Sequence, residues 1–408
     1  MKLTNIRLHS IKDVLPLGYL KEGIVALSFD IGGIAAGFIV ASQFNVFNLV
    51  AWAIALYPAI LSARGVISGI FSGRLSTALH LGTINARFRK NTDKFYFLIE
   101  AIIVLTLETS LIMSVFSVVV GFFFWGITVA DMIDILVVVS ATMFLGLINS
   151  LITIAFAVAS FKKGLDTDVV LYPIMSTVAD ITMTLLYVLT LSLFFFNFVG
   201  KIIIVSMAIL LGALALLFLF KSYHNKDFVK TIKESIFTLV LVTVIVNVTG
   251  TILREIDKVV AGRKEIYIVY PALIDTVGDV GSIIGSTATT KFALGLLAPS
   301  FGSLKSHSKR ILTTWLASLF MFSLYAVIAL YTEGLLTANA FLNFFSLLFI
   351  ANVIAVSMII LITFAVGYLT YKKGLDPDNF VIPIESSLAD SITTGALLFA
   401  LLILSYTI

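Results

Sequence analysis

The sequence predicts an all-α polytopic membrane protein with 11 spans, in which two parallel five-helix repeats are joined by one extra transmembrane helix. The 408-residue chain is 60% apolar and only 12% charged, with a mean hydropathy of +1.09, whereas soluble domains carry about 25% charged residues. Apolar runs of about 20 residues, each long enough to cross a bilayer as a helix, recur along the whole chain. The third observation is a motif that occurs twice.

The repeated motif places an aspartate inside an apolar run. Residues 162–180 read KKGLDTDVVLYPIMSTVAD, and residues 372–390 read KKGLDPDNFVIPIESSLAD. In each copy a proline follows the first aspartate by seven residues, and another aspartate follows the proline by seven. These later aspartates are Asp180 and Asp390.

A second landmark repeats at nearly the same spacing. Tyr57-Pro58-Ala59 matches Tyr270-Pro271-Ala272 at an offset of 213, and the motif above repeats at an offset of 210. We therefore expect a first five-helix repeat at 1–198, a linking transmembrane helix at 199–222 and a second five-helix repeat at 223–408.

The order of the spans sets the relation between the repeats. Five spans would leave a directly fused second copy inverted, and the sixth span restores its orientation. The repeats are thus expected to be parallel, related by a pseudo-two-fold axis along the membrane normal. The predicted spans are 23–41, 48–81, 95–124, 132–161, 169–196, 202–220, 232–253, 266–297, 311–331, 341–371 and 380–406.

The distribution of basic residues predicts the orientation. Lysine and arginine concentrate before the first span and after the second, fourth, sixth, eighth and tenth spans. The positive-inside rule then places the N-terminus and both KKGLD motifs in the cytoplasm and the C-terminus outside the cell membrane. The chain has no cysteine, which excludes thiolate chemistry. We expect the lipid bilayer as a partner, no nucleic acid, no cofactor, and one chain working as the equivalent of a fused dimer.

Asp180 and Asp390 are the strongest candidates for ion binding. A charged side chain within a membrane costs about 2.5–3.5 kcal/mol on insertion scales and usually faces a bundle interior or a watery path. Two equivalent carboxylates would attract a divalent cation, either directly or through the waters that Mg²⁺ retains. The alternative is hydrogen bonding between helices or a buried salt bridge. Secondary path candidates in the same helices are Ser176, Thr177 and Ser386.

The eighth span carries a polar stripe. Its members recur at helical spacing and therefore share one face: Asp275, Asp279, Ser282, Ser286 and Thr290. A water-lined path would explain the stripe, and polar contact between tightly packed helices is the alternative. The corresponding residues of the second span include no carboxylate: Ser62, Val66, Gly69, Gly73 and Thr77.

Two further charged residues lie within spans. Arg64 in the second span either balances Asp275 or Asp279 or extends to a membrane interface. Asp30 in the first span either joins the ion path, binds a coupling ion or serves packing.

Four prolines and four loop aspartates complete the residues that we single out in the sequence. The spans that contain Pro58, Pro173, Pro271 and Pro383 are expected to be kinked or broken there. Four aspartates are expected at the cytoplasmic mouth, where they gather cations or cap helices: Asp166, Asp168, Asp376 and Asp378.

The repeated motif resembles the last transmembrane helix of the MgtE magnesium transporters. That helix has a GLDPA-like start, a proline seven residues after the aspartate and another aspartate seven residues later; Gly374-Leu375-Asp376-Pro377, Pro383 and Asp390 match it. In the first repeat Gly164-Leu165-Asp166, Pro173 and Asp180 match, with Thr167 in place of the motif's proline.

The second helix of each repeat carries the other part of the resemblance. Pro58, Gly65 and the run Ser72-Gly73-Arg74-Leu75-Ser76-Thr77 are similar to the family's second-helix motif, as are Pro271 and Gly278-Asp279-x-Gly281. The Arg-Leu-Ser-Thr run is closest to the two-repeat solute-carrier relatives of MgtE in animals. The chain departs from the family at the motif's asparagine, replaced by Val66 and Asp279, and no segment resembles the regulatory N-domain or CBS domains.

The resemblance implies a path for Mg²⁺ or a related divalent cation, lined by the second and fifth helices of each repeat, with Asp180 and Asp390 as ion-binding carboxylates. We therefore expect a transporter or channel and not an enzyme. A Na⁺- or H⁺-coupled carrier on the same fold, in which Asp30, Asp275 or Asp279 binds the coupling ion, is the main alternative. An intramembrane aspartyl protease is the other, because Gly278-Asp279-x-Gly281 faintly resembles the motif of such enzymes.

Overall fold

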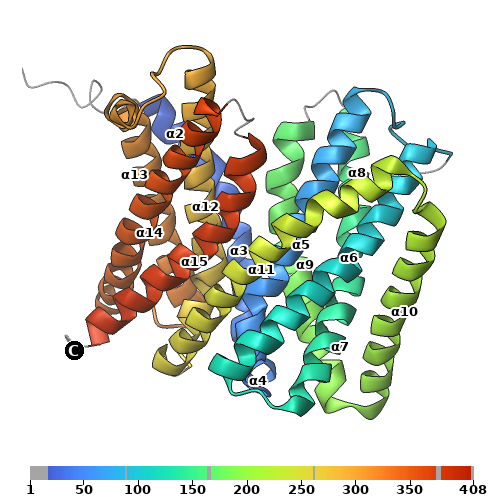
Figure 1. Cartoon of the computed structure of the whole chain (residues 1–408). Helices are drawn as coiled ribbons and strands as arrows, with labels where there is room; N and C mark the ends of the chain where they lie inside the picture. Colours follow the sequence, from blue (N-terminus) through green and yellow to red (C-terminus); the bar gives the residue numbers. More distant parts are fainter. Residues whose placement is uncertain (1–16, 88–89, 163–166, 261, 374–377, 406–408) are drawn as a thin grey trace, which may run out of the picture. The chain divides into compact units, whose positions relative to one another are not determined.

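The protein consists of long helices (Figure 1). The computed structural model describes residues 17–87, 90–162, 167–260, 262–373 and 378–405. The described part of the chain has 11 helical spans long and apolar enough to cross a membrane, as the sequence predicts. The polytopic all-α fold is thereby confirmed.

The first repeat and the linking helix contain six spans. The first span consists of α2 (Leu17–Leu27), a 3₁₀ turn (Ser28–Asp30) and α3 (Ile31–Ser42), and the short α4 (Phe44–Phe47) follows it. The others are α5 (Ala53–His80), α6 (Asp93–Val120), the pair α7 (Val129–Leu145) and α8 (Ile148–Lys162), α9 (Thr167–Phe196) and the linking helix α10 (Phe198–Ser222).

The second repeat contains five spans with similar bounds. They are α11 (Lys226–Val260), α12 (Lys264–Ala293), α13 (Ser308–Thr332) with a preceding 3₁₀ segment (Phe301–His307), α14 (Ala338–Lys372) and α15 (Asp378–Ser405). The fourth spans differ between the repeats, because α14 is continuous whereas its counterpart turns at Gly146. There α9 packs closely: a Cβ atom on Gly146 would lie 2.7 Å from the sulfur of Met183.

The chain forms two compact units that differ from the predicted repeats. One unit holds the described residues up to Ile31 together with those from Ala272 onward, and the other holds Gly32–Pro271. The unit boundary therefore cuts the first span and α12. The repeat boundaries at 198 and 222 remain a prediction.

The first span of each repeat packs against helices of the other repeat. In one unit α2 packs on α13, and in the other α11 packs on α5 and α6 (Figure 1). Matched glycines permit these contacts. A Cβ atom on Gly37 would lie 2.1 Å from the carbonyl oxygen of Ile268, and one on Gly250 would lie 1.9 Å from that of Ala55. Both glycines and both carbonyls are related by the same offset of 213. Each repeat thus packs its first helix against the other repeat, an arrangement that we call the exchange of first helices.

The helices that contain the four prolines are not broken, and the kinks that were the other expectation stay a prediction. Helices α5 and α12 run without interruption through Pro58 and Pro271, and α9 and α15 span positions 173 and 383. A proline in a helix leaves the carbonyl one turn earlier without its usual donor. For Pro271 this carbonyl belongs to Tyr267. Gly37 closely covers it, and a Cα–H···O contact of this kind offsets part of the loss.

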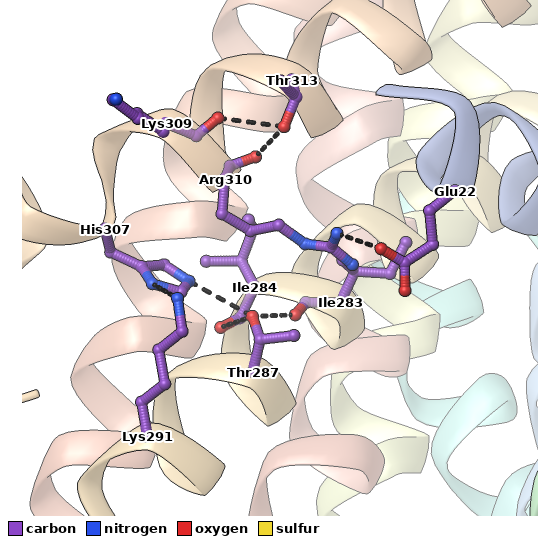
Figure 2. Close-up of polar contacts among 9 residues, drawn as sticks. All are labelled: Glu22, Ile283, Ile284, Thr287, Lys291, His307, Lys309, Arg310 and Thr313. Carbon is purple, nitrogen blue, oxygen red and sulfur yellow. Dashed lines mark hydrogen bonds and ion pairs between the residues drawn. The ribbon is translucent and has the colours of Figure 1, made fainter. Parts of the chain in front are cut away.

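A polar cluster fixes α2 to α13 (Figure 2). Arg310, which is almost fully buried, donates from Nη1 to Glu22 Oε2 at 2.7 Å. His307 lies beside it on the turn that precedes α13. The Thr287 hydroxyl donates its one hydrogen to the Ile283 carbonyl at 2.6 Å. Its oxygen therefore accepts a hydrogen bond from His307 Nε2. The other ring nitrogen, Nδ1, then accepts from the ammonium group of Lys291. The network thus holds His307 as the neutral Nε2–H tautomer.

The contact between Glu22 and Arg310 gives a stability prediction. Glu22→Ala leaves a buried guanidinium without its carboxylate, so we expect unfolding in detergent to require about 1–2 kcal/mol less free energy than in the wild type. Glu333→Ala is the matched control, because Glu333 has no ion-pair partner among the described residues. Equal melting temperatures for the two variants would show that the contact between Glu22 and Arg310 does not stabilise the packing of α2 on α13.

Candidate cation path

The second helix of each repeat is unusually buried, and that of the second repeat keeps an accessible polar face. In α5 and α12, 76% and 72% of the apolar stretch is buried, against 56% or less in every other described span. The predicted stripe of α12 is the exception within that helix. Asp275, Asp279 and Ser282 are partly exposed, and Ser286 and Thr290 are exposed. A row of side-chain oxygen atoms therefore stays accessible on a helix that is otherwise enclosed.

Asp390 lies where α15 approaches this stripe. A Cβ atom on Gly278 would lie 3.7 Å from the Cβ of Ala389, so α12 and α15 pack closely at the residues that precede Asp279 and Asp390. Asp390 is partly exposed, and its carbonyl accepts a hydrogen bond from Thr394 at 2.5 Å. The structure thus brings the second and fifth helices of this repeat together at the level of the two predicted carboxylates.

Asp30 joins the same unit through the exchanged first span. It is buried at the end of the 3₁₀ turn between α2 and α3. Its carboxylate accepts a hydrogen bond from Thr276 Oγ1 at 2.9 Å and lies beside the side chain of Asp279. A residue of the first repeat therefore meets the polar stripe of the second, which the sequence alone did not reveal.

Asp180 has an equivalent setting on α9 in the other unit. It is partly exposed, and its carbonyl accepts a hydrogen bond from Thr184 at 2.6 Å. The hydroxyl of Tyr57 on α5 lies 3.0 Å from Thr184 Oγ1 and ties the two helices together. One turn before Asp180, Ser176 is exposed and Thr177 packs against Gly32 of α3.

The burial of Arg64 does not favour the alternative in which its side chain extends to a membrane interface. It is fully buried within α5 and donates from Nη2 to Ser150 Oγ at 2.8 Å. Neither Nε nor Nη1 has a partner among the described residues. Arg64 and the aspartates of α12 belong to different compact units. The arginine consequently adds a buried positive charge to α5 at the position that Val277 occupies in α12.

Some predicted residues lie outside the described part. They are Asp166 and Asp376, together with the side chains of Asp168, Asp378 and Ser386. Among the described residues, no group of three or more Asp, Glu or His side chains is arranged to enclose a metal ion. Such a cage is not needed for Mg²⁺, which usually keeps several waters and binds through one or two carboxylates.

Four hydroxyl residues near the aspartates were not predicted as site residues: Tyr57, Thr184, Thr276 and Tyr325. The signal for the first two was present. Tyr57 begins the repeated Tyr-Pro-Ala landmark, and Thr184 recurs as Thr394 at the offset of 210 that relates the two aspartates. No repeated pattern marks Thr276 or Tyr325. Their link to Asp30 arises only when the first span packs against the second repeat.

Comparison with known proteins shows the family to which the chain belongs. A family model described as MgtE, divalent cation transporter, matches residues 57–190 and 270–400, which together exceed half of the chain. Each matched segment runs from the Tyr-Pro-Ala landmark to beyond the aspartate of the fifth helix. Searches of curated proteins and of solved structures gave no match. The chain therefore belongs to the MgtE family of divalent cation transporters, in a form with two repeats.

Proposed function

We propose that the protein carries Mg²⁺ across the cell membrane along the polar faces of α5 and α9 in one repeat and α12 and α15 in the other. The observation that carries the proposal is the accessible row of oxygen ligands on α12 beside Asp390. Charged groups within a membrane are costly unless they face a watery path or a partner. A face with accessible carboxylates on an otherwise buried helix fits a path for a hydrated cation.

Asp180 and Asp390 are the proposed ion-binding residues, with Asp279 and Asp275 beside the path in the second repeat. Carboxylate oxygens are the ligands that Mg²⁺ prefers, and the exposed hydroxyls of Ser176 and Ser286 can hydrogen-bond to its retained waters. Because both repeats are present in one chain, a monomer would supply what a dimer of single repeats supplies. We place the N-terminus in the cytoplasm and the C-terminus outside.

A second candidate is a carrier coupled to Na⁺ or H⁺. It is favoured by one observation: Asp30 is an additional buried carboxylate beside Asp279, distinct from the Asp180 and Asp390 pair. A monovalent ion bound there would be separate from the divalent ion.

Flux into liposomes separates the two candidates. We expect purified protein to take up Mg²⁺ down its own gradient at the same rate with and without a Na⁺ or pH gradient. The measurement uses a Mg²⁺ indicator trapped inside the liposomes, with protein-free liposomes as the control. Uptake that requires one of these gradients would instead establish the coupled carrier, and a lack of any divalent cation flux would refute both.

A further inference from the structure

A buried chain of hydrogen bonds leads from α13 to the carboxylate of Asp30. The Tyr325 hydroxyl lies 2.8 Å from Thr276 Oγ1, and Thr276 Oγ1 lies 2.9 Å from Asp30 Oδ2. Tyr325 and Thr276 are both 0% exposed, and Asp30 is 5% exposed. The three side chains come from the third helix of the second repeat, the second helix of that repeat and the exchanged first span.

The direction of the chain follows from the number of hydrogens. Thr276 has one hydroxyl hydrogen, which it donates to Asp30. Its oxygen must then accept from Tyr325, whose hydroxyl is the donor. A hydroxyl that accepts one hydrogen bond donates a stronger one, because the two bonds polarise each other. Asp30 therefore receives a strengthened, charge-assisted hydrogen bond that restricts its rotamer.

The chain of hydrogen bonds holds Asp30 through one of its carboxylate oxygens. The carboxylate is bonded through Oδ2 to Thr276 and also interacts with the Asp279 side chain. Asp30 ends a 3₁₀ turn within the first span, and such a segment inside a long helix is less regular than the helices around it. A carboxylate there needs side-chain partners to keep a single position.

The first repeat has no counterpart of this arrangement. At the offset of 213, Thr243 replaces Asp30, Ala63 replaces Thr276 and Val66 replaces Asp279. The hydrogen bonds of the Thr276 and Tyr325 hydroxyls therefore belong to the acidic site of the second repeat and are not required by the fold that the two repeats share.

We propose that Thr276 and Tyr325 are positioning residues for cation binding, which hold the Asp30 carboxylate beside Asp279 so that the exchanged span completes the second repeat's part of the path. The proposal rests on the proposed function and adds Asp30 to its ligands. Neither hydroxyl needs to touch the ion.

The test measures Mg²⁺ uptake by liposomes as a function of Mg²⁺ concentration. We expect Thr276→Val to raise KM about tenfold and Tyr325→Phe to raise it about threefold, each with a maximal rate near that of the wild type, because only the placement of a ligand is lost. Thr276→Ser keeps the hydroxyl and should restore the wild-type KM. A purely structural role would instead lower the amount of folded protein and the maximal rate.

Thr363→Val and Asp30→Asn are the controls. Thr363 is equally buried in the same unit, but its hydroxyl bonds only to carbonyls of its own helix, so its variant should keep the wild-type KM. If Asp30→Asn raises KM while Thr276→Val and Tyr325→Phe do not, the positioning role is wrong and the proposed path stands. Asp30→Asn, Thr276→Val and Tyr325→Phe could all retain the wild-type KM while Asp180→Asn abolishes flux. In that case Asp30 is not a ligand, and this inference is wrong whereas the proposed function stands.

Discussion

The double variant Asp180→Asn with Asp390→Asn is expected to lose Mg²⁺ transport while it still folds. Each substitution removes a negative charge from a partly exposed position within a span and keeps the size of the side chain. A tenfold loss at each site corresponds to about 1.4 kcal/mol of lost interaction with the ion, so the pair should reduce flux at least about 100-fold. Initial rates of Mg²⁺ uptake into liposomes, at matched protein content, measure this effect.

Glu108→Gln is the matched control for that variant. Glu108 also lies within a span, on α6, and its Oε2 is buried without a partner among the described residues. Neutralising it removes one carboxylate from the membrane region, as each of the two aspartate substitutions does, but leaves the proposed path intact, so transport should persist. Comparable losses in Glu108→Gln and the double variant would show that flux depends on total intramembrane charge and not on the two aspartates.

Gly250→Ala is expected to have the largest effect on folding. Its new Cβ atom would lie 1.9 Å from the carbonyl oxygen of Ala55, a backbone atom that cannot turn aside as a side chain can. Helix α11 must then move away from α5, and overpacking of this kind costs about 1–3 kcal/mol or more. The expected result is a markedly lower melting temperature in detergent and a smaller monodisperse fraction on gel filtration.

The control for Gly250→Ala lies in the linking helix. A Cβ atom on Gly212 in α10 would meet no atom within 4 Å, and alanine favours helices over glycine by about 1 kcal/mol. Gly212→Ala should therefore be neutral or stabilising. If Gly250→Ala were as stable as Gly212→Ala, the close packing of α11 on α5, and with it the reciprocal exchange of first helices, would be wrong.

The sequence predicts the spans and the fold class well because both depend on local signals. Apolar runs, the repeated Tyr-Pro-Ala landmark and the helical spacing of Asp275 and Asp279 each act within a few turns of helix. The 3.6-residue period places the α12 stripe on one face, and the structure shows that face to be accessible. The position of Asp390 beside α12 follows less directly, since it depends on how two helices pack.

The exchange of first helices could not be predicted, because packing between distant helices decides it. Its sequence trace is small: two glycines, Gly37 and Gly250, at an offset of 213. The site partners of Asp30 were missed for the same reason. At Pro58 helix α5 continues, so the break that local propensity allows does not occur, whereas a kink there stays a prediction. In each case a tertiary contact outweighs the local signal.

The most direct test of the proposed path is the position of a bound divalent ion. Crystals of the protein soaked in Mn²⁺, which shares the oxygen ligands of Mg²⁺ and scatters anomalously, would report it. We expect an anomalous peak beside the carboxylate of Asp180 or Asp390, at about 2–2.2 Å for direct coordination or about 4–5 Å through a retained water. Mn²⁺ peaks within the spans that lie away from both carboxylates, with none beside either, would contradict the assignment.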